Sequence, residues 1–441
     1  MLIKDLKDKN IIIWGMGTEG KAIKAYLERH NLPKQIFEYN DSDGQEKLSE
    51  LVAKADVIFR SPGVSIYKPE FLQIKEQGIK ITSSTNLFMA EMRANHPNTK
   101  IIAVTGSKGK STSVSMLYHM MKALGLKVAL GGNIGKALIE LLDEEFDYVI
   151  CELSSYQISD LETFPHIAVF TNLFSVHTDW HGGHEGYCRD KARLGQGADV
   201  AIININNPEL MKYTTDLPNK LYYGRPEGFH AVEKELFYKN EALCSIDSLK
   251  ISGNHNMENL AGIITALAYL GLDWRNGLKA LPEFEPLPHR LQKVGTFGKV
   301  LFINDSISTA PEAAISAMKS FNDRKMAIIS GGINNKQDYT EYAKCIEANP
   351  HVKAAVTLFQ CGPQIAESIK QYVKRKDFTL IEAEELQEAV DKAYAVMEQT
   401  NGDLILFSPT APSFDHYKNF MERGEDFINC VKTLANSKKI E

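Results

Sequence analysis

The 441-residue sequence lacks a long hydrophobic run, a strong excess of charge of one sign, and any closely spaced cysteine pair. Without an apolar run of about 20 residues no membrane-spanning helix is expected, and the charged start MLIKDLKDKN does not fit a signal peptide. The net charge of −6 gives no indication of a nucleic-acid partner or an anionic membrane. The six cysteines form no C-x-x-C pair, which is typical of reduced thiols in the cytosol. We therefore expect a cytoplasmic protein without membrane or nucleic-acid partners.

The composition that remains is that of a soluble globular protein, with 44% hydrophobic and 24% charged residues. Its length suits about three domains, and strands alternate with helix-compatible segments, which predicts an α/β fold with largely parallel sheets. Short β-like pieces at 220–223 and 236–238 suggest a side sheet. We expect a monomer with three domains: a Rossmann-like domain at 1–95, a central P-loop ATPase-type domain at 96–287, and a C-terminal Rossmann-like α/β domain at 288–441.

The most informative stretch is a glycine loop between an apolar strand and a helix, IIAVTGSKGKSTS at 101–113. The glycines let backbone N–H groups point at phosphate oxygens, the second lysine can reach the terminal phosphates, and a following hydroxyl can bind Mg²⁺. The spacing is shorter than G-x-x-x-x-G-K-[ST], but the strand directly before it favours a triphosphate site over an ordinary turn. The predicted ATP-binding loop comprises Gly106, Ser107, Lys108, Gly109, Lys110, Ser111 and Thr112.

A second strand-then-glycine unit, NIIIWGMGTEG, lies at 10–20. Gly15, Gly17 and Gly20 spell G-x-G-x-x-G, and a strand ending in Asn40 and Asp41 follows near the distance expected for the first half of a dinucleotide fold. A further short strand ends in the turn at 61–64. The N-terminal region therefore reads as a nucleotide-binding α/β domain.

Polar side chains follow other strands of the central region. Glu152 ends one strand, and His177 follows another, so both are expected near the P-loop at the carboxyl edge of the sheet, where they could hold Mg²⁺. Glu152 could instead be an acid exposed to solvent at the end of its strand. Lys191 lies in a helix-compatible stretch, and from the residues alone it is expected to be a surface lysine.

His177, His181 and His184 lack a dependable zinc spacing and cysteine partners, so zinc is not expected. Asn256 either caps the following helix or reads an adenine edge.

In the third region, polar clusters end three strands: Asn304-Asp305-Ser306 with Thr309, then Gly331-Gly332 with Lys336, and 408–415. Any one of them could be an ordinary turn. Together they predict a binding face.

The ordered set of motifs resembles the Mur ligase family, ATP-dependent amide-forming enzymes of peptidoglycan precursor synthesis. The resemblance spans nearly the whole chain. It rests on TGSKGKST at 105–112, E-x-S-S-Y-Q at 152–157, Asn172 with HTD at 177–179, HNMEN at 255–259, LPHR at 287–290, NDS at 304–306, GG…K at 331–336 and SPTAPSFDHYKNFMERGEDF at 408–427. The two-glycine start and the KNF…RG ending are most similar to members that add glutamate to UDP-N-acetylmuramoyl-L-alanine.

The resemblance implies ATP and two Mg²⁺ ions as cofactors, and UDP-N-acetylmuramoyl-L-alanine and glutamate as substrates. It implies that ATP phosphorylates the substrate carboxylate and that the glutamate amine attacks the acyl phosphate. The implied catalytic residues are Lys110, Glu152, His177 and Lys191, and the metal ligands are Ser111, Glu152, His177 and, if carbamylated, Lys191. Asn256, Asn259, Arg290 and Asp305 join the ATP site. UDP-substrate residues are Gly15, Gly17, Gly20, Asn40, Asp41, Ser61, Pro62, Gly63, Asn133 and Gln157. Glutamate residues are Thr309, Lys336, Ser413 and Phe420.

The sequence also departs from the family pattern of D-glutamate-adding enzymes. Ser107-Lys108 replaces Thr-Asn in the P-loop, the segment at 84–88 lacks a glutamate, Ile307 stands where lysine is usual, and Thr410-Ala411-Pro412 replaces Ala-Cys-Ala. These changes are similar to a subgroup that adds L-glutamate. Both enantiomers remain open, with D-glutamate as the family's main reaction.

Three other functions would each explain part of this pattern. The G-x-G-x-x-G at 15–20 alone would fit a nicotinamide oxidoreductase, but a single match of this kind is weak. A non-catalytic ATP-binding protein would not need Lys110, Glu152, His177 and Lys191. A folylpolyglutamate synthetase shares the short P-loop, but such an enzyme does not normally begin with a glycine unit like that at 10–20.

Overall fold

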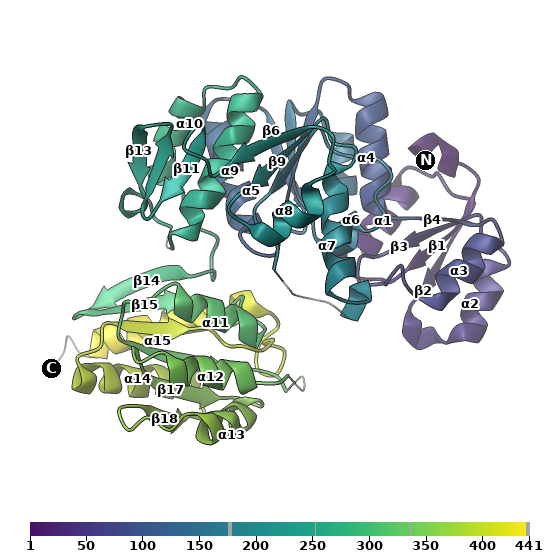
Figure 1. Ribbon diagram of the computed structural model, residues 1–441. Helices are drawn as coiled ribbons and strands as arrows, with labels where there is room; N and C mark the ends of the chain where they lie inside the picture. The colour runs from purple at the N-terminus through teal and green to yellow at the C-terminus, as the bar shows by residue number, and fades with distance from the viewer. Residues whose placement is uncertain (175–178, 252, 335–336, 438–441) are drawn as a thin grey trace. The chain divides into compact units, whose positions relative to one another are not determined.

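The computed structural model describes residues 1–174, 179–251, 253–334 and 337–437 (Figure 1). Its contacts divide the chain into two compact units. One runs from Met1 to Lys250 and from Asn254 to Phe284, and the other takes Ile251–Gly253 and Glu285–Glu441. No helix in the described part of the chain is both long enough and apolar enough to cross a bilayer.

The first sheet is parallel, with strand order β2-β1-β3-β4. Its central strand β1 is a continuous apolar run, Ile11–Trp14, buried on both faces, which is the pattern that helices covering both sides of a parallel sheet require. The elements of this part are β1 (Asn10–Trp14), α1 (Thr18–Arg29), β2 (Gln35–Tyr39), α2 (Gln45–Val52), β3 (Val57–Arg60), α3 (Pro69–Glu76), β4 (Lys80–Thr82) and α4 (Ser84–Asn95).

The second sheet has six parallel strands in the order β10-β9-β8-β5-β7-β6, with the P-loop strand β5 inside it. A separate antiparallel sheet, β11-β12-β13, lies against α9. The elements are β5 (Lys100–Thr105), α5 (Lys110–Ala123), β6 (Val128–Gly132), β7 (Tyr148–Glu152), α6 (Ser155–Ile158), β8 (Ile167–Phe170), α7 (His184–Ala192), β9 (Val200–Asn204), α8 (Pro208–Thr214), β10 (Lys220–Tyr223), β11 (Phe229–Val232), β12 (Glu235–Tyr238), β13 (Glu241–Ser245), α9 (His255–Tyr269) and α10 (Trp274–Lys279).

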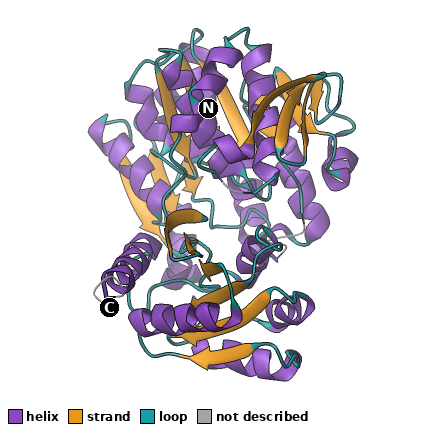
Figure 2. Ribbon diagram, turned by 90° about the vertical axis from the view of Figure 1, so that its left-hand side faces the viewer, coloured by secondary structure: helices purple, strands orange, loops and turns teal. Residues whose placement is uncertain are grey.

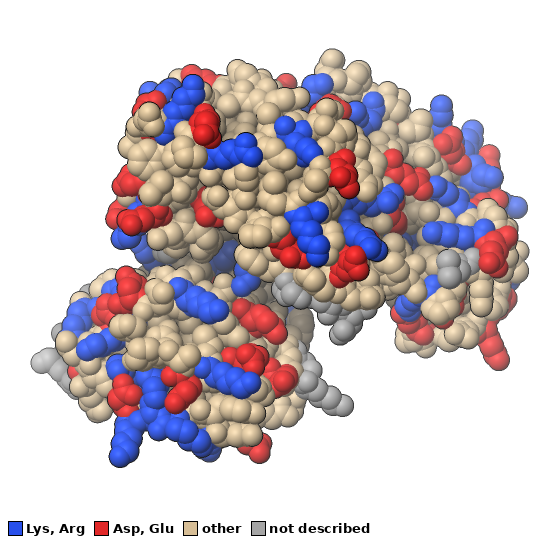
Figure 3. Space-filling model, viewed as in Figure 1, with Lys and Arg blue, Asp and Glu red and all other residues tan. Residues whose placement is uncertain are grey.

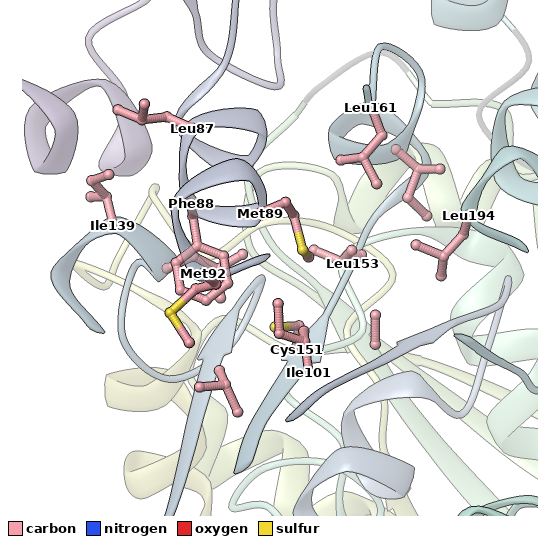
Figure 4. Close-up of a cluster of buried hydrophobic side chains, with 14 of the residues drawn as sticks. Leu87, Phe88, Met89, Met92, Ile101, Ile139, Cys151, Leu153, Leu161 and Leu194 are labelled. Atoms are coloured by element: carbon pink, nitrogen blue, oxygen red, sulfur yellow. The ribbon is translucent and has the colours of Figure 1, made fainter. Parts of the chain in front are cut away.

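The first sheet and the six-stranded second sheet share one hydrophobic core. Figure 4 shows side chains of α4, among them Phe88 and Met89, gathered with Ile101 and Cys151 of the second sheet, and all four side chains are buried. Helix α4 therefore joins the first sheet to the second, so that the two form one compact unit.

The other unit has a six-stranded sheet of order β14-β15-β19-β16-β17-β18, in which only β14 runs antiparallel to its neighbour. Helices flank this sheet (Figure 2). The elements are β14 (Gln292–Phe297), β15 (Val300–Asn304), α11 (Pro311–Lys319), β16 (Met326–Gly331), α12 (Thr340–Ala348), β17 (Val352–Leu358), α13 (Gly362–Tyr372), β18 (Thr379–Glu382), α14 (Leu386–Thr400), β19 (Leu404–Phe407) and α15 (Phe420–Ser437).

The predicted α/β class with three largely parallel sheets is confirmed. The domain boundaries at 95/96 and 287/288 stay predictions. One assignment was wrong: Lys220–Tyr223 pairs with β9 in the main sheet, whereas only the second β-like piece, in β12, belongs to the side sheet. On the face drawn in Figure 3, Lys and Arg side chains lie among Asp and Glu on each unit.

Candidate functional site

The P-loop at 106–109 connects β5 to α5, and its two glycines are required by close contacts. A Cβ at Gly106 would lie 1.9 Å from Thr171 Oγ1. At Gly109 the backbone has φ +81°, and a Cβ would lie 2.6 Å from Asn259 Nδ2. Larger residues at either position would therefore displace the loop or its supports.

The segment after β8 holds the loop in place from the side. Thr171 Oγ1 donates to Lys108 O at 2.7 Å, and Lys108 N donates to Asn172 Oδ1 at 2.8 Å. The Ser107 hydroxyl lies 2.7 Å from the Tyr187 hydroxyl and accepts from Phe174 N at 2.8 Å. The Ser107-Lys108 departure from the family pattern is therefore built into this network. Sequence reasoning missed Thr171, because nothing local to the loop points to it.

Glu152 ends β7 on the strand next to the P-loop strand and is buried. Its Oε1 accepts from Asn133 Nδ2 at 3.1 Å, whereas Oε2 has no hydrogen-bond partner among the described residues. A buried carboxylate oxygen normally has a partner, and a bound cation would supply one. Asn133, predicted to contact the muramoyl group, thus lies at Glu152.

Lys191 is buried, so the surface alternative for it is wrong. It comes from α7, with Nζ 3.4 Å from Thr105 Oγ1 and above the Tyr187 ring. Burial, and then the charge of Lys110, lower the pKa of Lys191 well below its ordinary value, while Glu152 acts in the opposite direction. The structure therefore brings P-loop, Glu152 and Lys191 to one sheet edge.

His177 lies outside the described residues. His181 is buried, with Nδ1 2.6 Å from Asp190 Oδ2 and Nε2 3.0 Å from Ser155 Oγ. Both of its ring nitrogens have partners, so His181 serves the packing of α7. Asp190 in turn accepts from the Tyr67 hydroxyl at 2.9 Å.

Asn256 and Asn259 lie in the first turns of α9. The helix begins at His255 with Asn254 as its N-cap, so the interpretation of Asn256 as the cap is wrong. Asn259 Nδ2 donates to Asn256 Oδ1 at 3.1 Å, and both residues are buried. Since Asn259 packs on Gly109, this pair is linked to the P-loop, while a contact of either asparagine with adenine stays a prediction.

A cavity of about 430 Å³ opens at the carboxyl ends of β1 and β2. A Cβ at Gly20 would lie 2.0 Å from Gly15 O, so this glycine allows α1 to approach the loop. Among the predicted UDP-substrate residues, those lining the cavity are Gly15, Gly17, Asn40, Asp41, Ser61, Pro62 and Gly63.

Asp41 is held rigidly in this cavity. Trp14 Nε1 donates to Asp41 Oδ1 at 2.9 Å, and Lys68 Nζ lies 2.6 Å from Oδ2. Partial burial acts to raise the pKa of Asp41, but the hydrogen bonds from Lys68 and Trp14 and the charge of Lys68 together lower it, which keeps the carboxylate charged. Gln157, in contrast, does not line the cavity; its Nε2 donates to Glu19 Oε1 at 2.6 Å.

In the C-terminal unit, Asp305 directly follows β15 and is buried. It accepts from Ser408 Oγ at 3.0 Å, from Leu291 N at 3.1 Å and from Ser308 Oγ. Burial raises the pKa of Asp305 to about 6, although the hydrogen bonds from Ser308, Ser408 and Leu291 and, to a smaller extent, the Arg290 charge act in the opposite direction. Arg290 and Asp305 therefore place a positive and a negative group at this edge. The Nε of Arg290 is buried and has no hydrogen-bond partner among the described residues.

Arg423 fixes the loops at this edge and was missed as a candidate, although the RG ending was noticed. Its buried guanidinium donates to Ser306 O at 2.8 Å, Ala411 O at 2.9 Å and Gly331 O at 3.4 Å. These carbonyls follow or end β15, β19 and β16, so one side chain ties three strand ends together. The sequence signal is an arginine followed by glycine in the segment after the last strand, and only the fold shows that this arginine is buried and which carbonyls it contacts.

Among the described residues predicted to bind glutamate, Thr309 and Ser413 lie on loops of the C-terminal unit and Phe420 begins α15. Thr309 O accepts from Gln337 Nε2 at 3.1 Å, and Ser413 O accepts from Tyr417 N at 2.9 Å. Phe420 O accepts from Ser306 Oγ at 2.8 Å. Lys336 lies outside the described residues. Of the described members, Phe420 is thus held by Ser306, which Arg423 also contacts.

Comparison with known proteins places this geometry in a family. Residues 104–267 match the Mur ligase middle domain, and residues 289–411 match the Mur ligase, glutamate ligase domain. A UDP-N-acetylmuramoyl-L-alanine--L-glutamate ligase of Xanthomonas euvesicatoria pv. vesicatoria is 32% identical, covering 97% of this chain and 96% of its own. A Micromonospora protein of the same name is 30% identical, with 99% of each chain covered.

Among solved structures, UDP-N-acetylmuramate-alanine ligase of Thermotoga maritima has a TM-score of 0.57 at 18% identity, covering 96% of this chain and 99% of that one. At that identity the likeness shows the shared fold. The family models and these relatives define an ATP-dependent ligase, as the sequence predicted. With the full-length relatives, the chain belongs to the Mur ligase family.

Proposed function

We propose that this protein joins L-glutamate to UDP-N-acetylmuramoyl-L-alanine, with ATP converted to ADP and phosphate, in peptidoglycan precursor synthesis. The observation that carries the proposal is the full-length similarity to relatives that bear the name of this reaction. The same names favour L-glutamate, the alternative, over D-glutamate, which was the main reaction predicted from the sequence. The residues at the strand ends beside the P-loop, and those at the strand ends of the C-terminal unit, support the chemistry.

In the first step the substrate carboxylate attacks the γ-phosphorus of ATP. A carboxylate O–P bond forms, the bond to the β-phosphate oxygen breaks, and ADP leaves. Lys110 would stabilise charge on the transferred group, while the P-loop N–H groups would hold the phosphates at the start of α5. The hydrogen bonds from Thr171 and Asn172 to the loop would keep that cradle rigid.

In the second step the glutamate amine attacks the acyl carbon. The tetrahedral intermediate loses inorganic phosphate and a proton, which leaves the amide. Thr309, Ser413 and Phe420 of the C-terminal unit would bind glutamate or position the loops that bind it, with Arg423 as the positioning residue beneath them. Ile307, half-buried where D-glutamate enzymes usually carry lysine, supports a different grip on the amino acid.

Mg²⁺, which this family uses with ATP, fits the residues present because Glu152 Oε2 is buried and lacks a partner among the described residues. Glu152, Ser111, carbamylated Lys191 and His177 would hold the ions, which neutralise phosphate charge when bound. Carbamylation requires a neutral amine, and the lowered pKa of Lys191 supplies one. The amine would add to CO₂ with loss of a proton, turning a cation into a carboxylate-like ligand.

The cavity lined by Gly15, Asn40 and Asp41 would take the UDP part of the substrate. Its glycines let a diphosphate approach the backbone, and the fixed Asp41 carboxylate offers an acceptor to the uridine. A monomeric state and a cytoplasmic location stay predictions.

The test is ADP release and amide formation from ATP and UDP-N-acetylmuramoyl-L-alanine with each glutamate enantiomer. We expect product with L-glutamate and little with D-glutamate, and none from Lys110→Ala with either. Product with D-glutamate alone would overturn the enantiomer, and no amide with either would overturn the proposed reaction. If ADP is still released when glutamate is left out, the ADP assay reports only the first step, phosphorylation of the substrate carboxylate.

A further inference from the structure

Helices α7 and α8 bring together a histidine, a cysteine and a glutamate that are not among the residues predicted for the ATP and Mg²⁺ sites. His184 and Cys188 stand one turn apart on α7, and Glu209 comes from the first turn of α8. His184 Nε2 lies 3.0 Å from Glu209 Oε1. Cys188 Sγ lies 3.6 Å from His184 Nε2 and 3.9 Å from Glu209 Oε1. Three different donor atoms therefore form one small triangle.

This triangle has the size of a metal-ligand set. Zinc binds sulfur at about 2.3 Å and nitrogen or oxygen at about 2.0–2.2 Å, so tetrahedral angles place ligand atoms roughly 3.3–3.6 Å apart. The observed separations of 3.0, 3.6 and 3.9 Å lie close to those values. An ion could thus bind through small side-chain torsions, without movement of either helix.

The chemistry of the donors selects the class of ion. A thiolate with an imidazole and one carboxylate suits zinc and similar transition metals, whereas Mg²⁺ prefers an all-oxygen shell. The Cys188 side chain is buried, but those of His184 and Glu209 are 38% and 34% exposed. Solvent could therefore supply a fourth ligand from the outer side.

We propose that His184, Cys188 and Glu209 bind one zinc-class divalent ion with a water as the fourth ligand, separate from the proposed Mg²⁺ ligands. On binding, the Cys188 thiol gives up its proton to solvent and the thiolate sulfur coordinates the ion. The ion links α7, which carries Lys191, to α8. The sequence argument against zinc was incomplete, because His184 has a cysteine partner four residues later and a carboxylate partner that only the fold reveals.

A simple His–Glu hydrogen bond beside a buried thiol is the competing account. It predicts no cooperation of Cys188 with the other two side chains toward a metal. Burial and the Glu209 charge raise the pKa of the Cys188 thiol to about 12, so without a cation the sulfur stays protonated at neutral pH. A thiolate signal near neutral pH therefore separates the two accounts.

The experiment is titration of the full-length protein with Co²⁺ in excess Mg²⁺, followed by visible and near-ultraviolet absorption. Excess Mg²⁺ occupies the oxygen-rich sites, and those sites yield no sulfur-to-cobalt charge-transfer band. We expect a charge-transfer band and tetrahedral d–d bands that saturate at one equivalent and are lost on adding Zn²⁺. Cys188→Ser should abolish the charge-transfer band. Cys345→Ser, which changes a half-buried thiol outside the cluster, should keep it.

His184→Gln and Glu209→Gln retain the thiol and alter residues with exposed side chains, so they test the site even if Cys188→Ser does not fold. Each should weaken Co²⁺ binding by about tenfold or more. A missing band in the wild-type protein, a band that persists in Cys188→Ser, or unchanged affinity in both glutamine variants would overturn the proposal. Each of these outcomes is independent of the ligase assay.

Discussion

Arg60, whose side chain is buried, and Asp160, whose side chain is 20% exposed, form a two-point ion pair between the end of β3 and the segment after α6. Arg60 Nε lies 2.7 Å from Oδ2, and Nη2 lies 2.7 Å from Oδ1. The same guanidinium donates to Tyr156 O at 2.7 Å, and Asp160 O accepts from Asn86 Nδ2 at 2.8 Å. The polar pair thus reinforces the hydrophobic contact by which α4 joins the first two sheets.

Arg60→Gln should destabilise this unit because it leaves the Asp160 carboxylate without its charged partner. Removal of one member of a fully buried pair costs about 3–5 kcal/mol, and because Asp160 is 20% exposed we expect a loss toward the lower end of that range in the free energy of unfolding measured by chemical denaturation. The matched control is Arg93→Gln, whose partner Asp199 is 46% exposed, and its expected cost is below about 1 kcal/mol. Equal losses in the two variants would contradict the importance assigned to the Arg60 pair.

Gly109→Ala should impair ATP binding through the geometry of the P-loop. The added Cβ meets the Asn259 side chain at 2.6 Å, and φ +81° adds backbone strain of about 1–2 kcal/mol, equivalent to roughly tenfold in affinity. We therefore expect ATP affinity by calorimetry to fall by about tenfold or more. Gly125→Ala has a similar φ of +77° with no neighbour within 4 Å, and should leave ATP affinity unchanged. If both variants bind ATP like the wild type, the contact with Asn259 is not limiting.

How much of this site the sequence could predict depends on the range of the interactions. The P-loop and the glycines at 15–20 were predictable because a strand, a glycine spacing and a helix are local patterns. The support of Lys108 by Thr171, and of three strand ends by Arg423, was not predictable from composition or spacing. Those contacts depend on which strands become neighbours.

Burial was the other property that the sequence did not reveal. Physics alone favoured a surface position for Lys191, because lysines are seldom buried. The side chain is buried because Tyr187 and Cys188 of α7 belong to the hydrophobic core, and Nζ lies 3.4 Å from Thr105 Oγ1 at the end of β5. The error at 220–223 has the same origin: a short β-like segment does not specify which strand it will pair with.

Lys191→Ala should lower ligase activity by about tenfold or more if the side chain serves as a carbamylated metal ligand. A small carboxylic acid such as formate or acetate should restore part of kcat, since it can replace the carbamate oxygens but not a packing methylene. Lys279→Ala, which changes an exposed lysine, should neither lose activity nor respond to the acid. Unchanged ligation in Lys191→Ala, or a loss that carboxylic acids do not reverse, would contradict the carbamate.

Asp305→Asn should change how stability depends on pH. Because the pKa of Asp305 rises from 3.8 to about 6 on folding, the native state binds more protons than the unfolded state between those values. The Asp305 contribution is therefore favourable at low pH and is lost as pH rises through about 6, by roughly 3 kcal/mol.

The measurement for Asp305 is denaturant unfolding of the wild type and of Asp305→Asn at a series of pH values from 4 to 8. The variant's stability relative to the wild type should rise with pH up to about 6 and then level off, whatever constant cost the lost acceptor adds at every pH. Asp377→Asn is the control, because that exposed carboxylate has a pKa lowered by its hydrogen bond to Lys353 and should give no such rise. A difference between wild type and Asp305→Asn that does not vary with pH would show that the buried carboxylate keeps its ordinary pKa.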